Sequence, residues 1–136
     1  MKFQDSITVE TSQFNHTEVK PHFINPNCFG EDFAEWLILK LEHLKKDGFE
    51  ISAPIQEDYG WGFWVSKERE TFWVAIGIIG DGQDDEIPQW NISINYDAGL
   101  NLIKRLFHKP DAADFERIRN SVFDILKNSA SIKVVE

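Results

Sequence analysis

A chain of 136 residues can bury one hydrophobic core without disulfides or metals, and a single domain over 1–136 is expected. The net charge of −9 disfavours general nucleic-acid binding, because phosphate neutralisation requires clustered Lys and Arg; it fits a basic protein partner or solubility alone. The single cysteine, Cys28, excludes an intramolecular disulfide, and no segment approaches the roughly 18 apolar residues of a membrane span. The expectation is a cytoplasmic protein that binds neither nucleic acid nor membrane.

The first third of the chain predicts one strand and one helix. Residues 7–9 alternate weakly, so a strand is expected somewhere within 3–24, in a register that the pattern does not fix. Glu31 and Asp32 open a helix, since acidic side chains are favourable in a first turn, and Gly48 closes it. The helix carries an apolar stripe at helical spacing, made of Phe33, Trp36, Leu37, Leu41 and Leu44.

Four strands are expected next, at 49–55, 61–65, 72–80 and 90–96, joined by links that favour an antiparallel meander. Apolar residues alternate with polar ones in the first and last of them, while 72–80 is almost continuously apolar, as in a central strand. A helix at 98–108, a second helix starting near Asp111 and a closing strand at 131–135 complete the chain. The order β-α-β-β-β-β-α-α-β predicts an α+β fold, a mainly antiparallel sheet with its helices packed on one face.

Pairing across the hairpins assigns residues to the two faces of the sheet. If Val65 faces Phe72, then Trp64 faces Trp73, and for the next hairpin Ile78 is paired with Ile92. The helices then cover one apolar face. The other face carries Gly62, Ala75, Gly77, Ser93 and Asn95, flanked by Trp64 and Trp73.

That second face has two interpretations. A flat floor of small and polar residues with two tryptophans is a plausible contact surface. Alternatively, the N-terminal segment folds over it, or the indoles lie flat on the sheet. The residues expected in the core on the opposite face are Phe33, Leu37, Leu41, Phe63, Val74, Ile76, Ile92, Ile94, Ile118, Val122 and Ile125.

The segment Glu57-Asp58-Tyr59-Gly60-Trp61 places two carboxylates directly before an aromatic strand. Paired carboxylates serve acid–base or metal chemistry, but they also accept backbone hydrogen bonds in turns. We expect a structured turn in which Glu57 or Asp58 accepts such bonds, Gly60 adopts a positive φ, and Trp61 is buried.

Other candidate sites are weaker. The acidic stretch 81–86 lacks the spacing of a calcium loop, and the histidines show no metal-ligand spacing. Cys28 precedes a helix, where its pKa could be lowered, but no partner base is evident. No catalytic residue, metal or cofactor is predicted.

From residue 27 onward the chain resembles a group of small, uncharacterised bacterial proteins. The resemblance rests on Cys28-Phe29-Gly30, Trp36-Leu37, the motif at 57–61 and Val134-Val135-Glu136. The group's motif is Glu-Asp-Trp-Gly-Trp, and Tyr59 stands here in place of its first Trp. The resemblance supports the topology and implies no activity.

The leading hypothesis is a non-enzymatic protein-binding module, of immunity or regulatory type, with a basic protein as its expected partner. The candidate binding residues are Glu57, Asp58, Trp61, Trp64 and Trp73. The alternative is a small-molecule binder or enzyme that uses a pocket at Glu57, Asp58 and Trp61. A homodimer built on the open sheet face is a third interpretation.

Overall fold

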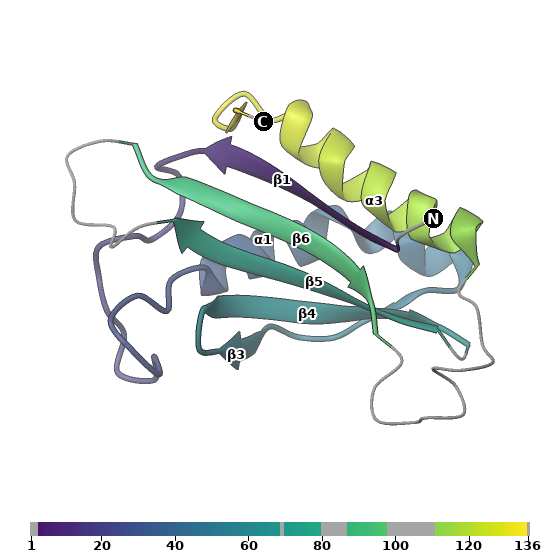
Figure 1. Ribbon diagram of the computed structural model, residues 1–136, viewed down its shortest axis with the longest axis horizontal. Helices are drawn as coiled ribbons and strands as arrows, with labels where there is room; N and C mark the ends of the chain where they lie inside the picture. The colour runs from purple at the N-terminus through teal and green to yellow at the C-terminus, as the bar shows by residue number, and fades with distance from the viewer. Residues whose placement is uncertain (1–2, 69, 80–86, 98–110, 136) are drawn as a thin grey trace.

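The computed structural model describes residues 3–68, 70–79, 87–97 and 111–135. An antiparallel sheet of seven strands carries helices on one face, which confirms the predicted α+β fold. In Figure 1, α1 (Glu31–Lys40) and α3 (Ala112–Lys127) lie behind the sheet, and the other face is turned toward the viewer. The helix expected at 98–108 lies outside the described residues.

The sheet is built on three long strands that follow one another in the chain, β4, β5 and β6, and these form the predicted meander. β1 lies between β6 and β7, and both β2 and β3 pair with β4 at the opposite edge. The strands are β1 (Gln4–Glu10), β2 (Glu50–Ile51), β3 (Ile55–Glu57), β4 (Gly60–Lys67), β5 (Glu70–Ile79), β6 (Gln89–Tyr96) and β7 (Lys133–Val134).

The register of the first long hairpin is as predicted, with Trp64 opposite Trp73. The predicted register of the second hairpin is wrong by two residues, because Ile78 faces Trp90 and Ile92 faces Ile76. A shift of two keeps every side chain on its predicted face. Trp90 explains the observed register of β5 and β6, because it is fully buried and its indole Nε1 donates to the carbonyl of Thr11 at 3.1 Å.

The segment 49–55, predicted as one strand, is divided into β2 and β3. Ile51 faces Val65 and Ile55 faces Gly62, so one extra residue bulges out between the two short strands. The bulge turns Ile55 onto the face away from the helices, where it is 37% exposed. Pro54 sits in this break and has no backbone N–H to donate to β4.

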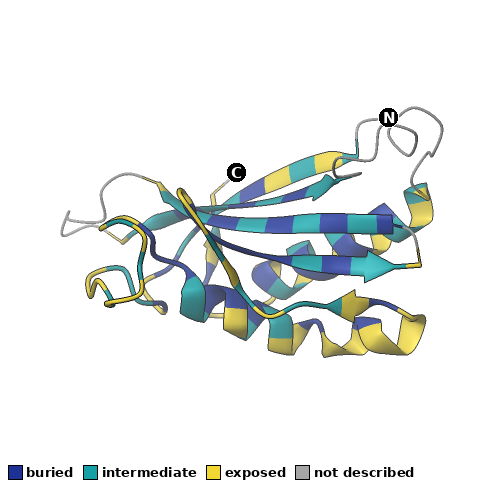
Figure 2. Ribbon diagram, turned by 90° about the horizontal axis from the view of Figure 1, so that it is seen from below, coloured by how far each residue is buried: buried dark blue, intermediate teal, exposed yellow. Residues whose placement is uncertain are grey.

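The hydrophobic core fills the space between the sheet and the helices. Figure 2 shows the result along the long strands, where buried and intermediate residues alternate. The predicted core residues are buried with one exception, Ile125, which is only partly buried because α3 turns Leu126 inward. The first predicted helix is divided into α1 and a 3₁₀ helix, η1 (Glu42–Asp47), which ends at Gly48 with φ +90°.

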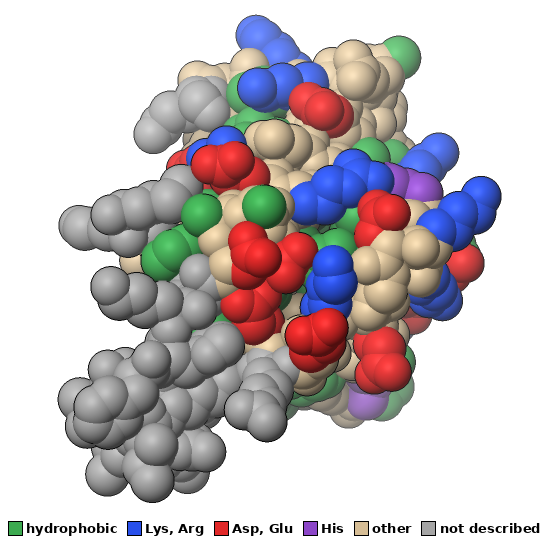
Figure 3. Space-filling view, turned by 90° about the vertical axis from the view of Figure 1, so that its right-hand side faces the viewer, with side chains coloured by type: hydrophobic (Ala, Val, Ile, Leu, Met, Phe, Trp, Pro, Cys, Tyr) green, Lys and Arg blue, Asp and Glu red, His purple; other side chains and the backbone are tan. Residues whose placement is uncertain are grey.

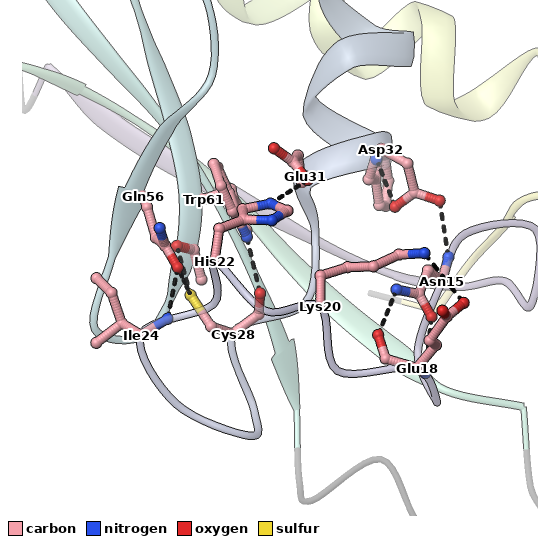
Figure 4. A network of polar contacts seen from close by, with 12 residues as sticks. Asn15, Glu18, Lys20, His22, Ile24, Cys28, Glu31, Asp32, Gln56 and Trp61 are labelled. Carbon is pink, nitrogen blue, oxygen red and sulfur yellow. Dashed lines mark hydrogen bonds and ion pairs between the residues drawn. The ribbon is translucent and has the colours of Figure 1, made fainter.

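The segment between β1 and α1 packs beside the core on the helix side of the sheet. The Phe14 ring stacks on Phe33 at 4.1 Å, and the backbone N–H of Asn15 donates to the carboxylate of Asp32 at 2.8 Å (Figure 4). The interpretation in which this segment covers the opposite face of the sheet receives no support from these contacts.

Candidate functional site

The five candidate binding residues are divided between the two sides of the sheet. Trp61 points into the core and is 4% exposed, as predicted for its strand parity. Trp64 and Trp73 project from the opposite face, which we call the open face, and both are half-buried. Glu57 and Asp58 are exposed at the turn between β3 and β4. The Trp61 indole is therefore buried on the helix side of the sheet, whereas the two carboxylates lie at the surface.

Trp61 is held by the segment before α1. Its indole Nε1 donates to the carbonyl of Cys28 at 2.7 Å, and the His22 ring contacts it edge-on (Figure 4). The Phe23 ring also contacts it edge-on. The Cys28 thiol is itself buried and lies 3.2 Å from the carbonyl oxygen of Glu57. The aromatic residue at the start of β4 therefore has a structural role.

Burial raises the pKa of the Cys28 thiol, although backbone hydrogen bonds from Ile24 and Asn25 lower it. The nearby charges of Asp58 and Glu31 raise it further. A reactive cysteine needs the opposite, a lowered pKa and access to solvent. The sequence-based idea that a helix terminus lowers this pKa is therefore wrong, and Cys28 acts as a small core residue.

The turn at Glu57 and Asp58 is fixed by the segment before α1. The Asn25 side chain donates to the carbonyl oxygen of Asp58 at 2.7 Å, and the Ile24 N–H donates to the Gln56 side chain at 2.6 Å. The predicted bonds from the turn backbone to the two carboxylates do not form within the described residues. The turn is structured as expected, but amide side chains hold it, and both carboxylates remain available at the surface.

The aromatic residues of the open face form one connected group. The Trp64 and Trp73 rings lie 4.7 Å apart at 55°, and Trp73 Nε1 donates to the hydroxyl of Tyr59 at 2.8 Å. The Trp73 ring lies over Gly62, where a Cβ atom would come within 2.2 Å of it. The alternative in which the indoles lie on the sheet is thus correct for Trp73, whose ring also forms one wall of a hollow.

The hollow has a volume of about 540 Å³ and opens on the same face. Its floor is made of small and polar side chains on β5 and β6, with Trp73 and Tyr59 beside it. The full lining comprises Tyr59, Trp73, Ala75, Gly77, Ile78, Ile79, Asn91, Ser93 and Asn95.

The predicted contact surface contains Trp73 and four residues of the floor. Sequence reasoning missed the other lining residues, which are Tyr59, Ile78, Ile79 and Asn91. Asn91 could have been found, because it shares strand parity with Ser93 and Asn95. Tyr59 could not, since the turn decides on which face its ring lies.

The charge nearest the hollow is negative and affects the pKa of Tyr59. Burial raises the pKa of the Tyr59 hydroxyl, the hydrogen bond from Trp73 lowers it, and the negative charge of Glu57 raises it further. Tyr59 therefore stays neutral at physiological pH and keeps a proton to donate. Glu57 on β3 is paired with Gly60 on β4, and Gly60 is paired with Gly77 on β5, which lines the hollow. The Glu57 carboxylate therefore lies on the open face, in line with the hollow across the strands.

A second hollow, of about 380 Å³, lies between the helices. There the Ser121 hydroxyl accepts from Arg117 Nη1 at 3.2 Å and lies 3.4 Å from His43 Nε2. Arg117 is also paired with Asp47 at 2.9 Å. These contacts join η1 to α3, so the residues have a packing role. Elsewhere on the surface, charges of both signs lie close together at one end of the molecule (Figure 3).

The described residues include no group of three or more His, Cys, Asp or Glu side chains placed to hold a metal ion. Among the same residues, no helix is long and apolar enough to cross a membrane. The chain matches no family model, no curated protein and no solved structure.

Proposed function

We propose that this protein is a module that binds another protein through the open face of its sheet. The single observation that carries the proposal is the aromatic group of Tyr59, Trp64 and Trp73 beside a 540 Å³ hollow, on a face that no described helix covers. Tryptophan and tyrosine are enriched where protein interfaces are energetically strongest. Their rings offer large contact area at low entropic cost, since each has few rotatable bonds.

The partner in this proposal is basic, because the chain carries a net charge of −9 and Glu57 and Asp58 lie exposed at the end of the open face. In this proposal the protein is of immunity or regulatory type and acts by binding that basic target. The proposal places the protein in the cytoplasm, where its single thiol would remain reduced. The resemblance to small bacterial proteins with the motif at 57–61 is part of the same proposal.

The test is affinity capture from a lysate of the source organism with wild-type protein and the double variant Trp64→Ala/Trp73→Ala. We expect a specific partner to be captured by the wild type and lost by the double variant. Leu39→Ala is the matched control, because Leu39 is 69% exposed on α1, on the other side of the sheet. Denaturation curves check that all variants are folded.

Capture that is unchanged in the double variant would contradict the proposal. A homodimer is distinguished by light scattering: a dimeric wild type that becomes monomeric on Trp64→Ala/Trp73→Ala would show that a second copy occupies the face. If the hollow binds a small molecule instead, the wild type should bind that molecule and capture no protein. Each outcome separates one of the three sequence-based hypotheses from the others.

A further inference from the structure

We propose that the hollow beside Tyr59 and Trp73 receives an arginine side chain of the partner. This inference rests on the proposed protein-binding function and adds the chemistry by which the open face recognises its target. Three features of the molecule support it: the aromatic walls, the unbonded polar side chains of the floor and the distribution of charge on the face.

The walls of the hollow are aromatic and polarised. Trp73 Nε1 donates to the Tyr59 hydroxyl, so the polar tip of the indole is satisfied within the protein and its ring remains available for contact. Cations are attracted to the faces of Trp and Tyr rings, and a guanidinium group can also stack flat on them. Trp64, 4.7 Å from Trp73, extends this aromatic surface along the sheet.

The floor of the hollow offers hydrogen-bond acceptors that no described residue uses. Asn91, Ser93 and Asn95 are half-buried on β6, and their side chains form no hydrogen bond within the described residues. Half-buried amides without partners are costly unless water or a ligand bonds to them. A guanidinium has five N–H donors in a rigid plane, and so it can bond several of these oxygens at once, which a lysine ammonium does less well.

The floor also provides the space. Gly77 and Ala75 present almost no side chain, and the nearest atoms to a Cβ built on Gly77 belong to Tyr59, at 3.6 and 3.7 Å. The volume of about 540 Å³ lies in the usual range for ligand sites. This volume is larger than one guanidinium group occupies. The aliphatic part of the arginine side chain and part of a neighbouring residue would therefore enter the hollow with it.

Charge on the open face favours a cation. Strand register places three carboxylates on it, those of Glu10, Glu50 and Glu57, and Asp58 lies in the adjoining turn. Among the described strand residues of that face, the only cation is Lys133, directly opposite Glu10. The acidic end nearest the hollow, at Glu57 and Asp58, has no such compensation within the described residues.

The experiment uses N-acetyl-arginine amide as the probe and N-acetyl-citrulline amide as its uncharged match. Two-dimensional NMR of the full chain follows the indole N–H signals of Trp64 and Trp73. We expect a saturable shift of these signals with the arginine compound, weakened by added salt, and a far smaller shift with citrulline. Trp73→Ala should abolish the response.

Charge variants give the second readout. Glu57→Gln should weaken arginine binding by roughly two- to fivefold, as expected for an exposed charge pair. Glu42→Gln is the control, because Glu42 is an exposed carboxylate on η1 that pairs with Lys45 at 2.9 Å, away from the open face. Its affinity for the probe should be unchanged. If the Trp73 variant is unfolded, the Glu57 and Glu42 pair still decides the question.

Equal shifts with citrulline, no shift with arginine, or an identical response of Glu57→Gln and wild type would each overturn the inference. Failure here is distinct from failure of the proposed function. A partner that is captured through Trp64 and Trp73 while arginine leaves the indole signals unmoved would mean that the face binds a protein without an arginine in the hollow. Arginine binding without a captured partner would retain the site and contradict the protein-binding function.

Discussion

The indole of Trp61 donates a 2.7 Å hydrogen bond to the carbonyl oxygen of Cys28, and this buried contact joins the start of β4 to the segment before α1. It explains how an aromatic residue next to two carboxylates serves the fold rather than a surface site. Trp61 is 4% exposed, so no solvent replaces the bond if it is removed.

Trp61→Phe should therefore be clearly destabilising. The variant leaves the Cys28 carbonyl without its donor, and a buried unsatisfied group costs roughly 1–3 kcal/mol in the free energy of unfolding. Trp73→Phe is the matched control, because its hydrogen bond to Tyr59 lies at an exposed position. The control should lose less than about 1 kcal/mol. Urea denaturation of the two variants measures the difference, and equal losses would contradict the assignment.

The turn between β3 and β4 requires a glycine at position 60. Its φ is +157°, positive as predicted, but close approach is the stronger constraint: a Cβ atom there would lie 2.4 Å from the carbonyl oxygen of Ile76. Gly60→Ala should cost roughly 1–3 kcal/mol or more, since backbone must move to accept the methyl group.

Gly77→Ala is the comparison, because the same methyl group at 77 would meet Tyr59 at ordinary contact distances of 3.6 and 3.7 Å. Its free energy of unfolding should stay within about 0.5 kcal/mol of the wild type. Thermal or urea unfolding measures both variants. A Gly77→Ala protein as unstable as Gly60→Ala would show that side-chain volume at these positions is not what matters.

The sequence predicted the sheet face of each side chain more accurately than it predicted the pairing register of the strands. The short connection between β4 and β5 leaves little freedom, and Trp64 is opposite Trp73 as expected. The connection between β5 and β6 is longer, so turn length does not set the register, and burial of Trp90 against Phe33 does. Even there the faces were correct, because an apolar strand that moves by two residues buries the same set of side chains.

The candidate site shows a similar division. Strand parity separated Trp64 and Trp73 from the core, and these residues do lie on the open face. Local pattern could not show that the bulge before β3 turns Ile55 outward, or that the turn places Tyr59 beside Trp73. Those features depend on contacts between segments far apart in the sequence, such as Asn25 with Asp58.

Glu70 should give the folded state a measurable pH dependence. Burial raises the pKa of this carboxyl above its usual value of 4.5; the backbone N–H of Asp111 lowers it, and Asp114 and Asp111 raise it further. The folded state therefore keeps a proton at pH values where the unfolded state has lost it. From about pH 4.5 up to the raised pKa, the contribution of Glu70 to the free energy of unfolding falls, and above that pKa it stays constant.

Glu70→Gln should remove this part of the decline, because the amide can accept the bond from Asp111 and cannot ionise. Urea denaturation at a series of pH values measures the slope for wild type and variant. Glu42→Gln, a change at an exposed carboxylate on η1, should keep the wild-type slope. An unchanged slope in Glu70→Gln would mean that the folded and unfolded states titrate alike at this position.

The last prediction separates the two components of the turn at 57–61. The Asn25 side chain donates to the carbonyl oxygen of Asp58 at 2.7 Å and accepts from the N–H of Asn27 at 2.9 Å. Asn25→Ala should therefore cost roughly 1–2 kcal/mol in the free energy of unfolding, through loss of both bonds. Asp58→Asn should change it by less than about 0.5 kcal/mol, since the carboxylate is exposed and accepts no hydrogen bond within the described residues.

Binding should show the reverse order. Asp58→Asn removes one of the charges at the acidic end of the open face, so capture of a basic partner should weaken while the fold stays intact. Asn25→Ala retains those charges, and once folded it should capture the partner nearly as well as the wild type. Urea denaturation and affinity capture on the same two preparations give both readouts. If Asp58→Asn instead destabilises the protein as much as Asn25→Ala and leaves capture unchanged, the carboxylate stabilises the turn and has no part in binding.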